Sequence, residues 1–205
     1  AIVQLHKNTS RTEPNVRATE VEIYDGLEAS SQNCWPSVNF DIGGINNFLS
    51  PVLPAGFYYK TFMWPASFWK KYEYFIRKSA GLGKSPTTPD PDIYEHRYIH
   101  CDVLIIGAGI SGVMAAKVAA KNGFKTLLID EKNYLGGETI YQDSEHFKVN
   151  NQTSGSWLDK EINEIKKTKN LEIKTRTSVA AFHGYNFLLA RENLTDHLPI
   201  EQRNG

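Results

Sequence analysis

Residues 101–112 read CDVLIIGAGISG. The residues before the first glycine form a nearly continuous apolar run, which is typical of a parallel strand covered on both faces. Three glycines follow at the spacing Gly-x-Gly-x-x-Gly, and residues 113–122 after them favour a helix. This order of strand, glycine loop and helix predicts an α/β fold, with part of a doubly wound dinucleotide-binding domain of the FAD/NAD(P) Rossmann-like type.

Each glycine of this loop has a separate expected role. Gly107 makes the tight turn after the strand, and Gly109 lets the backbone approach a pyrophosphate. Gly112 lets the helix pack closely on the strand. The helix amides near Ile110 and Ser111 then point at the phosphates, whose negative charge the helix dipole favours. The loop is therefore the predicted phosphate-binding segment.

A second strand is expected at residues 125–129, after a glycine that ends the helix. Asp130 and Glu131 follow it, eighteen and nineteen residues after Gly112. A carboxylate at the tip of the second strand accepts hydrogen bonds from ribose hydroxyls and repels a 2′-phosphate, so the pattern favours NAD or FAD over NADP. Asp130 is the leading ribose ligand, with Glu131 and Lys132 beside it.

Two further elements extend the predicted site. Gly136 and Gly137 form a turn of the kind that lies near the pyrophosphate in two-dinucleotide folds, and a plain loop is the open alternative. A helix capped by Ser156 is then expected, and residues 171–179 alternate as a third strand. The backbone at Val179 could meet an adenine ring, with ordinary core packing as the alternative. The apolar face of the expected helix comprises Leu158, Ile162 and Ile165.

The first part of the chain predicts less regular structure. Residues 20–24 alternate as one short strand, which ends in a turn at residues 25–26. Between Phe57 and Phe75, ten of nineteen residues are aromatic. Such density indicates either the core of this segment or a surface that a partner buries. A helix is expected over residues 66–78.

Three prolines within six residues mark a linker, since proline lacks the backbone donor that a helix or central strand needs. We therefore expect an N-terminal segment over residues 1–83, a linker over residues 84–100 and the first half of a dinucleotide-binding domain over residues 101–205. Both ends of the chain look cut, which indicates a fragment of a longer protein.

Composition excludes several function classes. The chain has 23 basic and 23 acidic residues, so it lacks the electrostatic footprint of a nucleic-acid-binding protein. Cys34 and Cys101 are too few for a disulfide framework or a thiolate metal site, so reduced thiols and a cytoplasmic location are expected. No segment resembles a membrane span, and no metal site or catalytic group can be identified.

Several stretches resemble the alpha (large) subunits of heterotetrameric sarcosine oxidases. The most specific reads PAGFYYKTFMWP at residues 54–65, and YEHRY at residues 94–98 runs into Cys101. The other matching stretches are EPNVRAT at residues 13–19, YDGL at residues 24–27, SQN at residues 31–33 and WPS at residues 35–37. Together they cover nearly the whole chain.

The resemblance implies an alpha subunit of three parts: a ferredoxin-like domain without its cluster, a dinucleotide-binding domain and a folate-binding domain. This chain would hold the tail of the first part, an aromatic-rich interface segment and half of the second part. It implies NAD bound in a structural role, with FAD and FMN mainly on the beta subunit and with gamma and delta subunits completing the complex.

The implied reaction is the oxidative demethylation of sarcosine to glycine, with oxygen as electron acceptor and tetrahydrofolate as one-carbon acceptor. The fragment alone should be inactive. The family loop usually has Pro-Ala where this chain has Ile110 and Ser111, and a small hydroxyl residue is more usual at Glu138. Carried over by motif, the NAD contacts are Ser111, Asp130, Glu131, Lys132, Glu138 and Val179.

Two other readings remain open. One is a related amine or opine oxidase, or a cyanide synthase alpha subunit, with FAD in this site. The other is a non-catalytic module that docks a partner through its aromatic segment while the nucleotide site has decayed. The intact loop glycines and Asp130 argue against decay.

Overall fold

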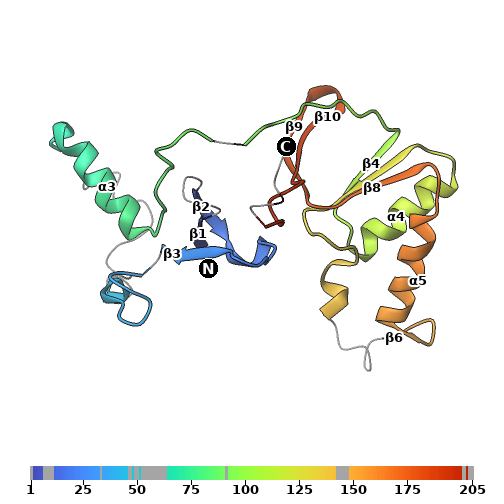
Figure 1. The fold of residues 1–205 in the computed structure, drawn as a ribbon, viewed down its shortest axis with the longest axis horizontal. Coiled ribbons are helices and arrows are strands. Elements are labelled where there is room, and N and C mark those ends of the chain that lie inside the picture. Colours follow the sequence, from blue (N-terminus) through green and yellow to red (C-terminus); the bar gives the residue numbers. More distant parts are fainter. Residues whose placement is uncertain are drawn as a thin grey trace. The chain divides into compact units, whose positions relative to one another are not determined.

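The chain forms two compact units in a computed structural model, one of residues 1–93 with 198–205 and the other of residues 94–197. Each unit contains its own sheet (Figure 1). The boundary between Ile93 and Tyr94 lies within the expected linker, residues 84–100. The structure describes residues 2–6, 12–32, 34–45, 48, 51, 64–90, 92–141, 148–199 and 202.

The first unit contains a small antiparallel sheet. Its strands are β1 (Ile2–His6), β2 (Thr12–Arg17) and β3 (Glu28–Ser31), in the order β2-β1-β3. Leu5 of the central strand is only 3% exposed, which makes it the buried apolar residue of this sheet among those described. The sheet is therefore held by backbone pairing with little apolar core beneath it.

The prediction of a strand at residues 20–24 is wrong. Its first residue ends the 3₁₀ helix η1 (Ala18–Glu20), and the others lie outside the strands of the sheet. An alternating segment becomes a strand only where it pairs with a neighbouring strand, and residues 21–24 pair with none of the three strands of this sheet. The expected turn does form, because Leu27 N donates to Tyr24 O at 3.2 Å and Gly26 has φ +81°.

The expected helix after Pro65 is confirmed. It begins as the 3₁₀ helix η3 (Ala66–Phe68), continues as α3 (Trp69–Ser79) and ends before Gly81, which has φ +69°. None of the residues of α3 is buried. Among the described aromatic residues of this segment only Tyr72 is half-buried and the others are exposed, which favours a partner surface over a core; residues 57–63 lie outside the described residues.

The chain after α3 pairs with the small sheet. Gly83 N donates to Asn15 Oδ1 at 2.9 Å, and Lys84 N donates to Gln4 Oε1 at 3.2 Å. Lys84, expected to begin the linker, is thus tied to β1.

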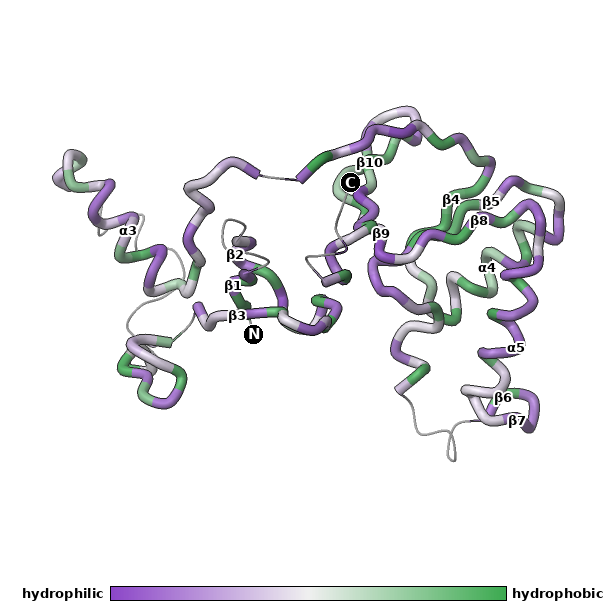
Figure 2. The backbone as a smooth tube through the Cα atoms, viewed as in Figure 1, coloured by the Kyte–Doolittle hydropathy of each residue, from purple (hydrophilic) through white to green (hydrophobic). Residues whose placement is uncertain are grey.

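The second unit contains a parallel sheet in the order β4-β5-β8. Its strands are β4 (Val103–Ile106), β5 (Thr126–Ile129) and β8 (Leu171–Lys174). The helix α4 (Ile110–Lys121) connects β4 to β5, and its start is three residues earlier than expected. The α/β class with a parallel sheet is therefore confirmed, and Figure 2 shows apolar residues gathered along β4 and β5.

The helix α5 (Ser154–Lys166) connects β5 to β8 after the short strands β6 (Lys148–Val149) and β7 (Gln152–Thr153). Its cap is Thr153, whose Oγ1 accepts a hydrogen bond from Ser156 N, so the expectation that Ser156 caps the helix is wrong. Both hydroxyl residues suit a cap. The chain turns into the helix at Thr153, which has the extended backbone of a cap.

The core of the second unit lies between the sheet and its helices. The expected face of α5 packs there, with Leu158 at 2% and Ile165 at 0% exposure. The buried cluster comprises Ala108, Val113, Ala116, Leu128, Leu135 and Ile165. Burial of this apolar area stabilises the unit by roughly 25 cal/mol per Å².

The third strand is shorter than expected. Residues 171–179 do not form one strand, because β8 ends at Lys174 and a new strand, β9 (Thr177–His183), begins after a turn. Arg176 in that turn has φ +52°, which redirects the chain. β9 pairs with β10 (Phe187–Glu192) in a separate antiparallel hairpin.

Among the described residues, no helix is long and apolar enough to cross a membrane.

A group of charges joins α4 to α5. Lys117 Nζ hydrogen-bonds the carboxylate of Glu161, which is 7% exposed, and lies 2.8 Å from Glu164 Oε2. Lys121 Nζ lies 2.7 Å from Glu164 Oε1. Hydrogen bonds from Lys117 and then Lys121 lower the pKa of Glu164 to about 2 from its ordinary 4.5.

We predict that Glu164→Gln removes an acid-sensitive part of the stability. The lowered pKa stabilises the folded state above pH 4.5, and this contribution is lost as the pH falls toward 2. The urea midpoint should therefore be lower for the variant at pH 7, and the difference should vanish near pH 2.5 by circular dichroism. Glu73→Gln, which breaks an exposed pair with Arg77, is the control. A difference independent of pH would contradict the assignment.

Candidate nucleotide-binding site

The predicted glycine loop lies at the carboxyl end of β4. Gly107 has φ +93°, a conformation that residues with a side chain rarely adopt. Its N–H donates to Ile129 O of β5 at 2.8 Å. The turn is thus fixed to the neighbouring strand.

Gly112 allows the first turn of α4 to pack on this loop. A methyl group at Gly112 would lie 1.8 Å from Gly107 O, which is backbone and cannot move aside easily. The close approach of the helix to the loop therefore requires a glycine here.

Gly109, like Gly107, faces open space. A methyl group at this position would have no atom within 4 Å, and its φ of −63° is accessible to any residue. The first amides of a helix have no partner inside it, and Gly109, the N-cap of α4, has no side chain to satisfy those of Ile110 and Ser111. An anion beside Gly109 would meet these amides and the positive end of the helix dipole.

Asp130 connects the acidic segment to the loop. Its Oδ2 accepts a hydrogen bond from Ala108 N at 2.5 Å, and its Oδ1 accepts one from Lys132 N at 2.8 Å. Each oxygen keeps a second lone pair, so a ribose hydroxyl can still donate to it. Glu131 beside it is exposed. The structure thus brings the predicted acid into contact with the glycine loop, a contact that sequence spacing alone does not specify.

The second glycine pair lies against the same loop. Gly136 N donates to Ala108 O at 2.7 Å, and Gly136 and Gly109 form a parallel bridge. A methyl group on Gly137 would lie 3.1 Å from Gly109 Cα. The two glycine motifs, which are separated by 24 residues in sequence, are therefore in direct contact.

Lys132 and Glu138 form an ion pair at this edge. Lys132 Nζ lies 2.9 Å from Glu138 Oε1 and 5.7 Å from the centre of the Tyr134 ring. The hydrogen bond that Lys132 donates to Glu138 raises the pKa of Lys132 above its ordinary value. These two predicted contact residues therefore contact each other.

Val179 lies in the hairpin strand β9, where it is half-buried. The start of this strand is tied to the acidic segment, because Thr177 N donates to Asp130 O at 2.8 Å and Arg176 N donates to Lys132 O at 2.9 Å. Val179 follows two residues later. It is thus near the acidic segment along the chain, although it does not end a strand of the parallel sheet.

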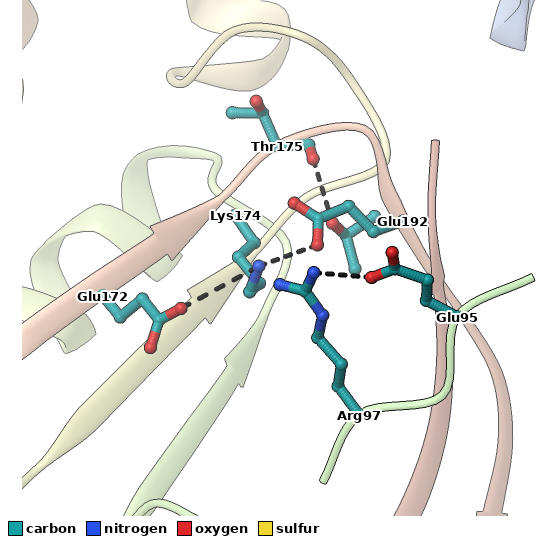
Figure 3. A network of polar contacts seen from close by, with 7 residues as sticks. Glu95, Arg97, Glu172, Lys174, Thr175 and Glu192 are labelled. Carbon is teal, nitrogen blue, oxygen red and sulfur yellow. Dashed lines mark hydrogen bonds and ion pairs between the residues drawn. The ribbon is translucent and has the colours of Figure 1, made fainter. Parts of the chain in front are cut away.

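Charged residues that the sequence analysis missed surround the break between β8 and β9. Lys174 Nζ lies 2.7 Å from Glu192 Oε2 and 3.9 Å from Glu172 Oε1, and Arg97 hydrogen-bonds Glu95 beside them (Figure 3). These residues are far apart in sequence, so no local pattern predicts the network. It holds the end of β10 against the end of β8.

Other reactive side chains carry no assigned chemistry. His6 Nε2 lies 2.9 Å from Ser30 Oγ on adjacent strands, but His6 is only half-buried and Ser30 is exposed on the small sheet. Burial raises the pKa of the Cys101 thiol, which keeps it protonated at neutral pH. No group of three or more metal-binding side chains occurs in the described part of the chain.

Comparison with known proteins defines the class. Residues 102–198, nearly the whole of the second unit, match the family model described as FAD dependent oxidoreductase. The parallel sheet and its glycine loop fit this match. These findings support an oxidoreductase domain with a flavin as its class of cofactor.

Individual similar proteins give more specific information than the family model. The chain is 43% identical to the sarcosine oxidase subunit alpha of Rhizobium meliloti (strain 1021), over 94% of this chain and 20% of the relative. It is 32% identical to the corresponding subunit of Corynebacterium sp. (strain P-1), over 58% of this chain and 12% of the relative. A solved L-proline dehydrogenase from P. horikoshii aligns with a TM-score of 0.39 and 24% identity, over 49% of this chain and 20% of its own.

The similarity to sarcosine oxidase alpha subunits thus extends over nearly the whole chain, which spans a fifth or less of the length of these curated relatives.

We predict that alanine substitutions at two loop glycines affect different properties, one the stability of the second unit and the other nucleotide binding. Gly112→Ala should destabilise the second unit by about 2 kcal/mol or more, because the methyl group overlaps backbone. Gly109→Ala should change stability by less than about 1 kcal/mol and weaken dinucleotide binding at least about tenfold, because its methyl group enters the space beside the helix amides. Thermal unfolding and nucleotide content of the purified full protein measure both effects.

The control is Gly155→Ala in the first turn of α5, where a methyl group also meets no atom within 4 Å. It should leave nucleotide content unchanged. Normal nucleotide binding by the Gly109→Ala protein would exclude this loop as the phosphate site.

Proposed function

We propose that the edge of the parallel sheet beside Gly109 binds the pyrophosphate of NAD in a structural role. The observation that supports this most is the open space at Gly109, bounded by uncapped helix amides on one side and by Gly137 on the other. The free N–H groups and the positive end of the dipole of α4 lie at this space, and no side chain blocks it.

The ribose would bind at the acidic segment. Asp130 and Glu131 follow β5 and supply carboxylates that accept hydrogen bonds from ribose hydroxyls. The adenine would lie toward Val179, since the start of β9 is hydrogen-bonded to the acidic segment. Ile110, Ser111 and the other loop residues would hold the phosphates.

The proposed whole-protein function is that of a sarcosine oxidase alpha subunit. The relatives named as sarcosine oxidase subunit alpha support it. In this proposal the partners would be beta, gamma and delta subunits. The complex would demethylate sarcosine to glycine, with oxygen accepting the electrons and tetrahydrofolate the one-carbon unit. In this proposal NAD stabilises the alpha subunit, and FAD and FMN on the beta subunit carry the electrons. The chain's own residues bind and orient the nucleotide.

A second candidate is FAD in this same site, as in a directly redox-active amine or opine oxidase or a cyanide synthase subunit. The match of residues 102–198 to the FAD dependent oxidoreductase model favours it. The glycine loop and the acid serve the ADP half that both cofactors share. The two candidates therefore differ in the cofactor released from the protein.

We predict that the denatured full protein releases NAD without flavin absorbance, as measured by mass and absorbance. Asp130→Ala should lower the nucleotide content at least about tenfold, since it removes both the ribose acceptor and the bond to Ala108 N. Asp159→Ala on the exposed side of α5 is the control. Release of FAD would establish the second candidate, and release of no nucleotide from folded protein would refute the site.

A further inference from the structure

Lys132 lies at the position where a basic side chain can discriminate between NAD and NADP. It follows the acidic pair Asp130 and Glu131, at the edge that holds the ribose in the proposed function, on which this inference rests. In dinucleotide sites, a carboxylate at this position accepts a hydrogen bond from the ribose 2′-hydroxyl of NAD. A basic residue nearby instead accommodates the 2′-phosphate of NADP. The chain therefore places both kinds of group at one edge.

The ammonium of Lys132 is already engaged. Its Nζ lies 2.9 Å from Glu138 Oε1, and its side chain is 27% exposed against 81% for that of Glu138. The hydrogen bond that Lys132 donates to the Glu138 carboxylate is the largest cause of the raised pKa of Lys132. Lys132 is thus a partly covered cation whose charge is neutralised by a carboxylate on the solvent side.

The backbone fixes both partners. Lys132 N donates to Asp130 Oδ1, and Lys132 O accepts a hydrogen bond from Arg176 N at 2.9 Å. Glu138 lies in the 3₁₀ helix η4 (Gly137–Tyr141), directly after the glycine pair that contacts the loop. The far end of this helix is held by the hydrogen bond between the hydroxyls of Tyr134 and Tyr141, at 2.8 Å. The ion pair therefore joins two segments that are held in place independently.

We propose that Glu138 is a specificity-determining residue that makes the site reject a 2′-phosphate. With Glu138 present, three carboxylates belong to this edge: Asp130 and Glu131 directly precede Lys132 in the chain, and Glu138 pairs with it. A 2′-phosphate is repelled by this negative edge and finds Lys132 already paired. Without the Glu138 carboxylate, Lys132 is released to pair with a 2′-phosphate, which its charge favours.

The test compares the nucleotides released by the full protein and its Glu138→Gln variant from the same cells. Mass spectrometry of the denatured proteins gives the molar ratio of NADP to NAD. The ratio should rise about five- to tenfold in the variant, which is the effect of removing one nearby solvent-exposed charge and freeing another. Glu73→Gln removes the same charge from the exposed pair with Arg77 and should leave the ratio unchanged.

Lys132→Gln and the double variant show whether the effect passes through Lys132. If it does, adding Glu138→Gln to Lys132→Gln should not raise the ratio. An unchanged ratio in Glu138→Gln, or an equal rise in the double variant, would overturn the inference while NAD release still supports the proposed function. Release of FAD alone, or of no nucleotide, would overturn the proposed function and the inference with it.

Discussion

The carboxylate of Asp130 accepts hydrogen bonds from the amides of Ala108 and Lys132, while its own backbone pairs with β8 and with the start of β9. One residue therefore holds the glycine loop, the acidic segment, the third parallel strand and the hairpin in a common position. Hydrogen bonds to an ionised carboxylate are stronger than those between neutral groups. The arrangement of the candidate site thus depends on a side chain that is also its leading ribose ligand, so binding and local folding use the same group.

The sequence predicted those elements of the fold that are determined by their own residues. The run before Gly107, the glycine spacing and the apolar face of Leu158 and Ile165 each specify an element through its own residues, and the structure contains all three elements. The strand expected at residues 20–24 failed because a strand needs a pairing partner, and the sequence of a segment does not show whether it will find one. The single strand expected over residues 171–179 failed because Arg176 adopts a positive φ, which a non-glycine residue does not signal.

The candidate site shows the same division. Spacing placed Asp130 near a loop, but the contact of its carboxylate with Ala108 N arises from the pairing of β4 with β5. Likewise, the Lys132–Glu138 pair depends on the turn between them, and the network of Lys174 and Glu192 depends on the hairpin. Aromatic density between Phe57 and Phe75 allowed either a core or an interface, with the core as the favoured interpretation, and the lack of buried residues in α3 favours the interface instead. The composition of a segment does not determine its burial, because burial depends on which other parts of the molecule pack against it.

The contact between Gly109 and Gly137 also constrains how sequences of this kind can diverge. A side chain at Gly137 would be pressed against the Cα of Gly109, and the bridge from Gly136 to the loop leaves neither segment room to withdraw. A larger residue at position 137 can therefore be accepted only after a shift of the glycine loop, whereas a methyl group at position 109 meets no atom within 4 Å. Among related sequences, position 137 should accordingly stay glycine, whereas position 155, where an added Cβ meets no atom within 4 Å, should vary more freely.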